Sequence, residues 1–171
     1  NKINCIVFPQ GPISECKILF NFSIDYCKIS NDIHFIWRLH PDTNLSKLKK
    51  YYNNFKNLPK NITISNKSLN KDLINSDYAL YRGSAAVIMA VNFNVQPIYL
   101  DYGIDINIDP LYEINEWKIK INNSKDLLNK IKTYKNKKNF QLNFERKKMI
   151  NYCKNYYSKI KINEIINLIK K

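Results

Sequence analysis

A cation, a glycine and a serine stand side by side at Arg82, Gly83 and Ser84, where the apolar run DYALY gives way to a helical pattern. Gly83 allows a tight turn, so the N–H groups from Ser84 to Ala86 point outward, with the positive end of the helix dipole behind them. Arg82 can add a bidentate cation, the Ser84 hydroxyl can donate to a phosphate oxygen, and the small Ala85 leaves room for a ligand. This combination predicts phosphate binding. The alternative is an ordinary strand-to-helix turn in which Ser84 caps the helix.

A second candidate is Arg38-Leu39-His40-Pro41, at the end of the apolar run HFIWRL. Pro41 biases His40 toward an extended backbone, which can aim the imidazole at a phosphate. The alternative is a strand-end histidine whose ring is satisfied by backbone groups. Arg38 belongs to an apolar run, where a guanidinium is costly unless it is paired, so we expect it to face a carboxylate or a ligand.

Four further residues can support such a site from neighbouring loops. Gln10 and Gly11 follow the apolar run INCIVF, and Gly11 keeps that loop clear of a ligand. Glu15 suits the start of a helix, but it can also pair with either of the two arginines or bind a ribose hydroxyl. Tyr102 follows the run QPIYL and can stack on a base.

Apolar runs and helical patterns alternate along the chain, and these elements must position the candidate residues. The expected strands cover residues 3–8, 34–39, 61–65, 77–81, 96–102 and 117–122. The expected helices cover residues 13–30, 44–56, 68–75, 84–93, 124–135 and 140–171, with serine caps at residues 68 and 124. The pattern predicts an α/β fold, a Rossmann-like parallel sheet of about six strands with helices on both faces. We expect one domain over residues 1–171, with a core (1–122) and basic C-terminal helices (123–171).

The positive charge of the chain is concentrated in its C-terminal part. Residues 1–116 carry a net charge of +1, and residues 117–171 carry +13. A basic helical segment can bind nucleic acid, an anionic membrane surface or an acidic partner. The alternative is a solvated, lysine-rich face without a partner.

The sequence lacks the motifs of several common enzyme classes. There is no GxGxxG, Walker, GxSxG or HExxH pattern, so dinucleotide oxidoreductase, NTPase, hydrolase and zincin activities lose their support. The cysteines and histidines do not cluster as zinc ligands do, and we expect no metal and buried, reduced thiols. No apolar run reaches the roughly 18 residues that span a bilayer. The chain starts without Met and enters a strand almost at once, so we expect the later part of a longer protein.

Taken together, four segments between residues 3 and 102 carry a resemblance: IVFPQGPISE, FIWRLHP, LPKNITIS and SDYALYRGSAAVIMAVNFNVQPIYL. In this order they resemble the C-terminal, donor-binding half of GT-B glycosyltransferases of bacterial surface-carbohydrate synthesis, in capsule or lipopolysaccharide. The His-Pro pair followed by a serine at a helix start is similar to sialyltransferases that use CMP-activated sugars. The resemblance implies that His40 and Ser84 hold the nucleotide phosphate. Ala85 stands where relatives often have a second serine.

The resemblance also implies a function: a nucleotide-sugar-binding domain whose donor is a substrate, with no cofactor. The general base is expected in an N-terminal acceptor half, so this chain alone is predicted to be inactive. The expected location is cytoplasmic, or peripheral on the inner face of the bacterial plasma membrane through residues 117–171, and we do not expect nucleic acid as a partner. The alternatives are a CDP-glycerol-type polymer transferase domain, a non-catalytic basic module that docks on membrane or nucleic acid, and a GT-B relic that serves only in assembly.

Overall fold

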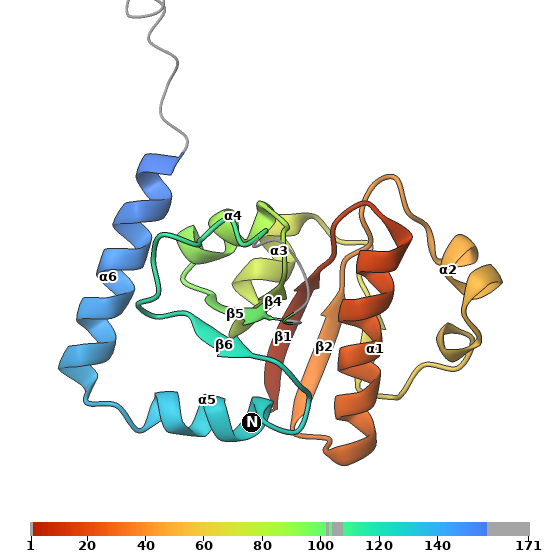
Figure 1. Cartoon of the computed structure of the whole chain (residues 1–171), viewed down its shortest axis with the longest axis horizontal. Coiled ribbons are helices and arrows are strands. Elements are labelled where there is room, and N and C mark those ends of the chain that lie inside the picture. The colour runs from red at the N-terminus through yellow and green to blue at the C-terminus, as the bar shows by residue number, and fades with distance from the viewer. Residues whose placement is uncertain (1, 102, 104–107, 157–171) are drawn as a thin grey trace, which may run out of the picture.

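The computed structural model describes residues 2–101, 103 and 108–156, and contains one six-stranded sheet in which all strand pairs are parallel (Figure 1). The strand order is β3-β2-β1-β4-β5-β6. The strands are β1 (Ile3–Phe8), β2 (Ile33–Trp37), β3 (Ile62–Ile64), β4 (Tyr78–Tyr81), β5 (Gln96–Leu100) and β6 (Ile119–Ile121). The helices are α1 (Ile13–Ile29), α2 (Leu45–Tyr51), the 3-10 turn η1 (Asn53–Phe55), α3 (Leu69–Ile74), α4 (Ala86–Asn92), α5 (Leu127–Lys135) and α6 (Asn139–Tyr156).

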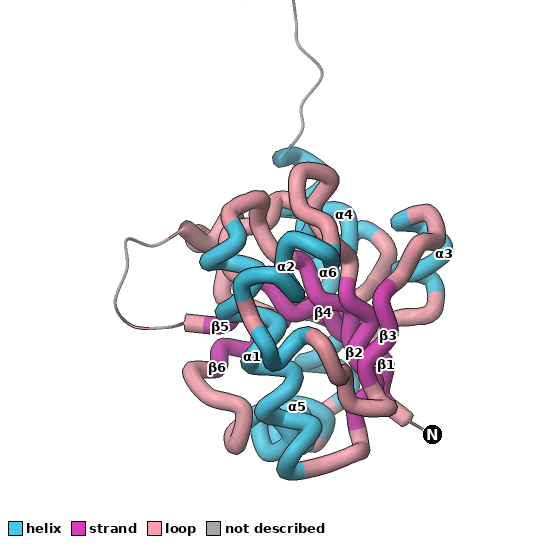
Figure 2. The backbone as a smooth tube through the Cα atoms, turned by 90° about the vertical axis from the view of Figure 1, so that its right-hand side faces the viewer, coloured by secondary structure: helices cyan, strands magenta, loops and turns pink. Residues whose placement is uncertain are grey.

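The sheet separates two hydrophobic layers, because successive side chains of each strand point to opposite faces. Cys5 and Val7 of β1 pack with α1, α2 and α5 on one face, while Ile6 and Phe8 pack with α3, α4 and α6 on the other. Figure 2 shows the strands next to one another with the helices around them. The predicted Rossmann-like sheet with helices on both faces is therefore confirmed.

The strand order reverses beside β1, which lies between β2 and β4 at the centre of the sheet. In open α/β sheets, ligands bind outside the carboxyl ends of the strands at such a reversal. The loops that follow β1, β2 and β4 therefore define the region in which the candidate residues must be examined.

Some predicted boundaries were wrong. The last expected strand cannot begin at Trp117, because its φ of 61° lies in the left-handed region, and β6 starts at Ile119. Ser124 does not cap α5: the helix follows Asp126, whose N–H is bound by the Asn123 side chain instead. Ser68 stands at the N-cap of α3 but makes no side-chain capping bond. The expected 44–56 helix is divided into α2 and η1, and the expected C-terminal helix is described as far as Tyr156.

Helix α6 is tied to α5 and to the segment before β6 by a buried carboxylate, Glu145. It accepts hydrogen bonds from the Tyr134 hydroxyl, from Lys137 Nζ at 2.9 Å and from the Trp117 N–H at 3.3 Å. Burial raises the pKa of Glu145, but the hydrogen bonds from Tyr134 and Lys137 outweigh it, and the net pKa lies below the ordinary value. Because the folded-state pKa is depressed, Glu145 contributes stability above its unfolded pKa and loses it as the pH falls.

We expect this contribution to appear in the pH dependence of Glu145→Gln. The variant should be less stable than the wild type at about pH 6. The difference should narrow as the pH falls below about 4.3, the ordinary pKa of a glutamate, because the unfolded wild-type chain then binds a proton that folded Glu145 still excludes. Urea unfolding at several pH values measures both free energies. A difference that stays constant or widens toward acid would contradict this assignment.

All four cysteines are free thiols, and Cys5, Cys16 and Cys153 are buried. Burial raises the pKa of Cys16 to about 11 and that of Cys153 to about 12, so these thiols are protonated at neutral pH. None of the helices in the described part of the chain combines the length and apolarity that a bilayer-crossing segment needs.

Candidate functional site

The loops after β1 and β2 meet at Gly11 and His40. The Thr43 hydroxyl donates to the Gly11 carbonyl at 2.8 Å and joins the two loops. A Cβ added to Gly11 would lie 3.3 Å from Nδ1 and from Cε1 of His40, so the imidazole rests against this glycine. The ring is partly exposed, and its Nδ1 accepts a long hydrogen bond from the Asp42 N–H, at 3.3 Å. His40 follows the carboxyl end of β2, as predicted, and the exposed Pro41 lies beside it.

The loops after β1 and β4 meet at Gln10 and Gly83. A Cβ on Gly83 would lie 2.1 Å from Nε2 of Gln10, so the Gln10 amide occupies the place of a side chain at position 83. The backbone carbonyl of Gln10 accepts a hydrogen bond from the Cys16 thiol at 3.4 Å. Gly83 is thus required for a close approach between two loops, and Gln10 is the residue that uses it. Three strand ends are brought together at the strand-order reversal.

Arg82 and Glu15 form an ion pair beneath these loops. Arg82 Nε lies 2.9 Å from Glu15 Oε2, and the two side chains are 3% and 16% exposed. Among the partners left open by the sequence, Glu15 therefore pairs with Arg82, while it also lies in the first turn of α1. The pair joins the end of β4 to the start of α1 and fixes the position of both loops. The predicted contact between Arg82 and a phosphate stays a prediction.

We expect the effects of changing Arg82 and Glu15 on the free energy of unfolding to be coupled. Arg82→Met removes the guanidinium from a carboxylate that is largely buried, and should lower the free energy of unfolding by about 2–4 kcal/mol. Combining it with Glu15→Gln should cost clearly less than the sum of the two single changes, because residues in direct contact are coupled. Urea unfolding of the four proteins measures this coupling. Strict additivity would contradict the pairing.

Arg38 was expected to face a carboxylate or a ligand, and it faces a carboxylate, that of Asp72. Its Nη1 lies 2.5 Å from Oδ2 of the buried Asp72 on α3, and it also donates to the Lys67 carbonyl at 2.9 Å. Arg38 follows β2 rather than forming its last part, since the strand ends at Trp37. The pair ties the end of β2 to α3, and phosphate binding by Arg38 stays a prediction.

Ser84 and Ala85 precede α4, which begins at Ala86 and not at Ser84 as predicted. The carbonyls of Ser84 and Ala85 accept hydrogen bonds from Val87 and Ile88, so the first turn is tightened by bonds between residues three apart. Ser84 is therefore not the N-cap, and Ala85 takes that position without a side-chain capping bond. In the described part of the chain, the N–H groups of Ser84, Ala85 and Ala86 have no backbone acceptor.

The start of α1 adds further donors that the sequence analysis did not single out. Its N-cap is Pro12, whose carbonyl accepts the N–H groups of Glu15 and Cys16, and no side chain caps the helix. Among the described residues, the N–H groups of Ile13 and Ser14 have no backbone partner. The proline before an apolar helical pattern was the available signal, because proline is common at helix starts. Two uncapped backbone segments, residues 13–14 and 84–86, thus flank His40, Gln10 and the two glycines.

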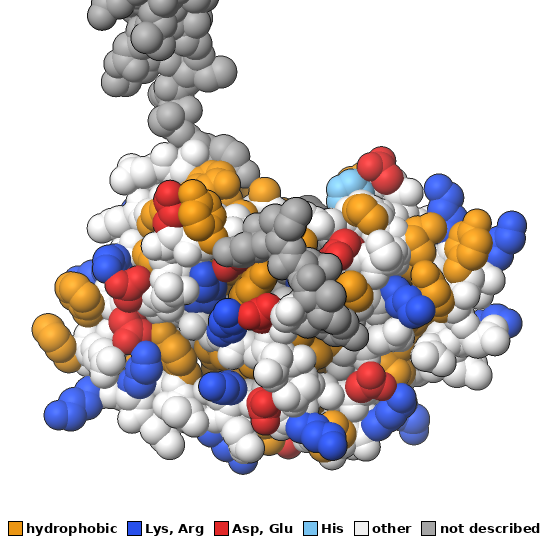
Figure 3. Space-filling view, viewed as in Figure 1, with side chains coloured by type: hydrophobic (Ala, Val, Ile, Leu, Met, Phe, Trp, Pro, Cys, Tyr) orange, Lys and Arg blue, Asp and Glu red, His pale blue; other side chains and the backbone are white. Residues whose placement is uncertain are grey.

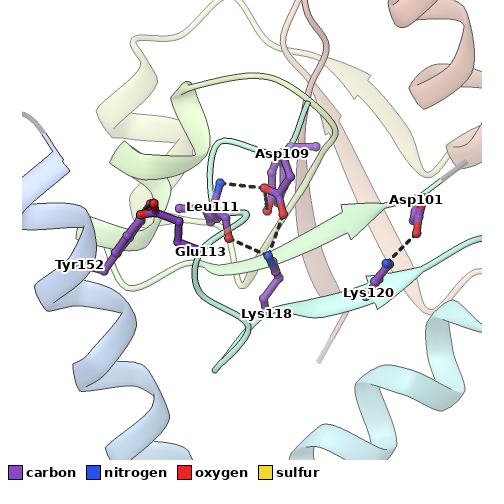
Figure 4. A network of polar contacts seen from close by, with 8 residues as sticks. Asp101, Asp109, Leu111, Glu113, Lys118, Lys120 and Tyr152 are labelled. Carbon is purple, nitrogen blue, oxygen red and sulfur yellow. Dashed lines mark hydrogen bonds and ion pairs between the residues drawn. The ribbon is translucent and has the colours of Figure 1, made fainter. Parts of the chain in front are cut away.

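A second polar cluster joins the end of β4 to residues 109–111 and to Lys118 (Figure 4). Lys118 Nζ lies 2.7 Å from Asp109 Oδ2 and donates to the Leu111 carbonyl at 2.7 Å, and the Tyr81 hydroxyl donates to Asp109 Oδ1 at 2.8 Å. Burial and the neighbouring Asp109 raise the pKa of Tyr81 well above its ordinary value. The sequence did not reveal this cluster. Tyr102, the predicted base-stacking residue, lies outside the described residues.

Comparisons with known proteins show which solved structures share this fold. No family model matches the sequence, and no curated protein matches it. Similar solved structures include two enzymes of sugar transfer and one epimerase. The glycotransferase of kitacinnamycin has a TM-score of 0.62 and 10% identity over 97% of this chain and 42% of its own. The glycosyltransferase SnogD from Streptomyces nogalater has a TM-score of 0.57 and 12% identity over 91% of this chain and 40% of its own.

The third structure is the UDP-GlcNAc 2-epimerase from Methanocaldococcus jannaschii, solved in complex with UDP-GlcNAc and UDP. It has a TM-score of 0.52 and 18% identity over 80% of this chain and 39% of its own. At these identities the likeness shows the fold: this chain has the Rossmann-like fold of one half of a GT-B protein. The chain spans less than half the length of each of the three structures.

Proposed function

We propose that this chain is the nucleotide-sugar-binding domain of a GT-B glycosyltransferase, with the nucleotide phosphate at the carboxyl ends of β1, β2 and β4. The observation that carries the proposal is the convergence of His40, Gly11, Gln10 and Gly83 between two uncapped N–H segments, at the strand-order reversal. The epimerase with a similar fold was solved with UDP-GlcNAc and UDP, so UDP should be tested beside CMP and CDP.

The chemistry of these residues suits a phosphate better than a metal ion. The imidazole of His40 can donate a hydrogen bond to a phosphate oxygen. Among the described residues, the N–H groups of residues 13–14 and 84–86 have no backbone acceptor, so they can donate to a phosphate without breaking a backbone hydrogen bond. The two arginines are already paired with Glu15 and Asp72, so they stiffen the site from below. The described residues contain no group of three His, Cys, Asp or Glu that could hold a metal ion.

In the transfer reaction, the bond between the sugar carbon and the nucleotide phosphate oxygen breaks, and the electron pair stays on that oxygen. His40 and the backbone N–H groups would stabilise the charge that develops there, since preorganised donors act most strongly where charge appears. An acceptor oxygen forms the new bond, and its proton goes to a base that we assign to an N-terminal acceptor half of the same protein. This chain would therefore bind the donor nucleotide and transfer nothing alone.

The finer assignments are also part of this proposal. They are a CMP-activated sugar donor, a role in surface-polysaccharide synthesis, a single domain over residues 1–171 and a cytoplasmic location. A CDP-glycerol-type donor remains the second candidate, because phosphate contacts through His40 and backbone N–H groups do not depend on the group that is transferred.

Calorimetric titration of the full chain with UDP, CMP and CDP tests the proposal. We expect at least one of them to bind with a Kd below about 1 mM, which corresponds to about 4.1 kcal/mol. Gly83→Val should abolish this binding, because its side chain would displace Gln10 and cover the neighbouring N–H groups. If no nucleotide binds, or if the binding is unchanged in Gly83→Val, the proposal is wrong.

A further inference from the structure

Helix α6 carries two phenylalanines whose side chains are exposed to solvent. Phe140 is 84% exposed and Phe144 is 61% exposed, whereas Met149 and Cys153 of the same helix are buried against α4. Phe140, Phe144 and Lys147 follow one another at spacings of four and three, so they share the helix face opposite to the buried side. Figure 3 shows hydrophobic side chains projecting at the edge formed by α6, with Lys and Arg side chains and also some acidic side chains around them.

Basic residues dominate the segment that contains these phenylalanines, although Glu116 pairs with Lys148 of α6 and Glu113 accepts from Tyr152. Residues 127–156 contain nine Lys and Arg residues and a single acidic residue, a net charge of +8. The acidic residue is Glu145, which is buried and accepts from Lys137. Lys138 and Lys147, next to the phenylalanines along the chain and along the helix face, are exposed. We call Phe140, Phe144, Lys138 and Lys147 the α6 patch.

We infer that the α6 patch docks this domain on an anionic lipid surface, with both phenylalanines inserted among the acyl chains and the lysines at the headgroups. Aromatic residues on one helix face flanked by lysines are the composition of helices that lie in a membrane interface. Each lysine near an anionic bilayer makes the binding free energy more favourable through its charge. The phenylalanines add to it because their apolar surface is removed from water. This inference does not depend on nucleotide binding.

Two other occupants fit the α6 patch less well. A second copy of the chain would bring two strongly positive faces together, which opposes association. Single-stranded nucleic acid is held in grooves that follow its backbone, whereas the outward face of a helix is convex. A lipid surface is a flat, negatively charged partner that can also accept the phenylalanine rings.

The position of the α6 patch leaves the candidate nucleotide site free. Phe140 and Phe144 lie in the first turns of α6, and Figure 1 shows that this helix starts beside α5 and runs toward the end of the molecule where β1 terminates. Docking through the start of α6 would therefore hold the carboxyl edge of the sheet away from the membrane contact.

Vesicle co-sedimentation of the full chain tests the inference. Vesicles of equal parts phosphatidylcholine and phosphatidylglycerol should bind the protein, and pure phosphatidylcholine should bind it much less. Phe140→Ala/Phe144→Ala should weaken the partition coefficient by about tenfold or more, and Lys147→Gln by about fivefold. Ile74→Ala and Lys71→Gln are matched controls on α3, where Ile74 is 72% exposed, and both should bind as the wild type does.

Three outcomes would overturn the inference. They are equal binding to neutral and anionic vesicles, anionic binding that is unchanged in Phe140→Ala/Phe144→Ala, and absence of vesicle binding. In the last case, oligonucleotide binding or self-association that disappears in the double variant would assign the α6 patch to that partner instead. Circular dichroism of each variant confirms that the fold is retained.

Discussion

Replacing Lys118 with methionine is expected to lower the free energy of unfolding by about 3–5 kcal/mol, because it removes one member of a buried ion pair. Lys118 and Asp109 are 4% and 3% exposed, and their charged atoms lie 2.7 Å apart. The ammonium also donates to the Leu111 carbonyl, so the change removes two charge-assisted contacts from one small cluster. Urea unfolding followed by circular dichroism measures the loss.

Lys120 of β6 provides a matched control, because Lys118 lies just before the same strand. It lies two residues after Lys118 and also faces an aspartate, Asp101, at 2.7 Å, but its side chain is 64% exposed. Lys120→Met should therefore cost less than about 1 kcal/mol, as exposed ion pairs usually do. Similar losses for the two variants would show that burial does not distinguish them, and would contradict the role assigned to Lys118.

Replacing His40 with alanine is expected to weaken nucleotide binding by about tenfold to a hundredfold, the usual effect of losing a hydrogen bond to a charged group. The ring rests on Gly11 with part of its surface exposed at the carboxyl edge of the sheet. The stability of the domain should hardly change, because His40 makes no buried contact that the fold requires. Calorimetric titration with the nucleotide that the wild type binds most tightly measures the effect.

His34, the other histidine of the chain, is the control for this experiment. It lies near the beginning of β2, opposite Asn4, and its Nε2 is 3.1 Å from the Thr63 hydroxyl. Burial and the nearby Lys2 lower the pKa of His34, so it is neutral at pH 7 and carries no charge for a phosphate. His34→Ala should leave nucleotide affinity unchanged. Equal losses for the two histidines would contradict a specific contact at position 40.

The sequence was sufficient to predict which residues lie at the carboxyl edge. Alternating strands and helices imply a parallel sheet, and this placed His40 and Gly83 after strands that end on the same side. It was not sufficient to predict how the residues pair. Glu15 and Arg82 are 67 positions apart, and their contact depends on β1 and β4 being neighbours, which the order of the chain does not reveal. Gln10 fills the space at Gly83 for the same reason.

Lys118 and Lys120 show a different limit of sequence interpretation. Both occupy polar positions of an alternating pattern, and the sequence offers no difference between them. In the structure, residues 109–111 close over Lys118 and leave Lys120 largely exposed. Ser84 is a comparable case, since a serine before a helical pattern predicts a cap, while the actual first turn is closed by backbone bonds from Val87 and Ile88.

The most direct test of the nucleotide site is a titration of the isotope-labelled chain with UDP, CMP or CDP, followed by amide chemical shifts. We predict that the largest shifts fall on residues 10–14, on His40 and on residues 83–86, and that α6 stays unperturbed. Shifts centred on α5 and α6, or no shifts with any of the three nucleotides, would contradict a phosphate site at the ends of β1, β2 and β4.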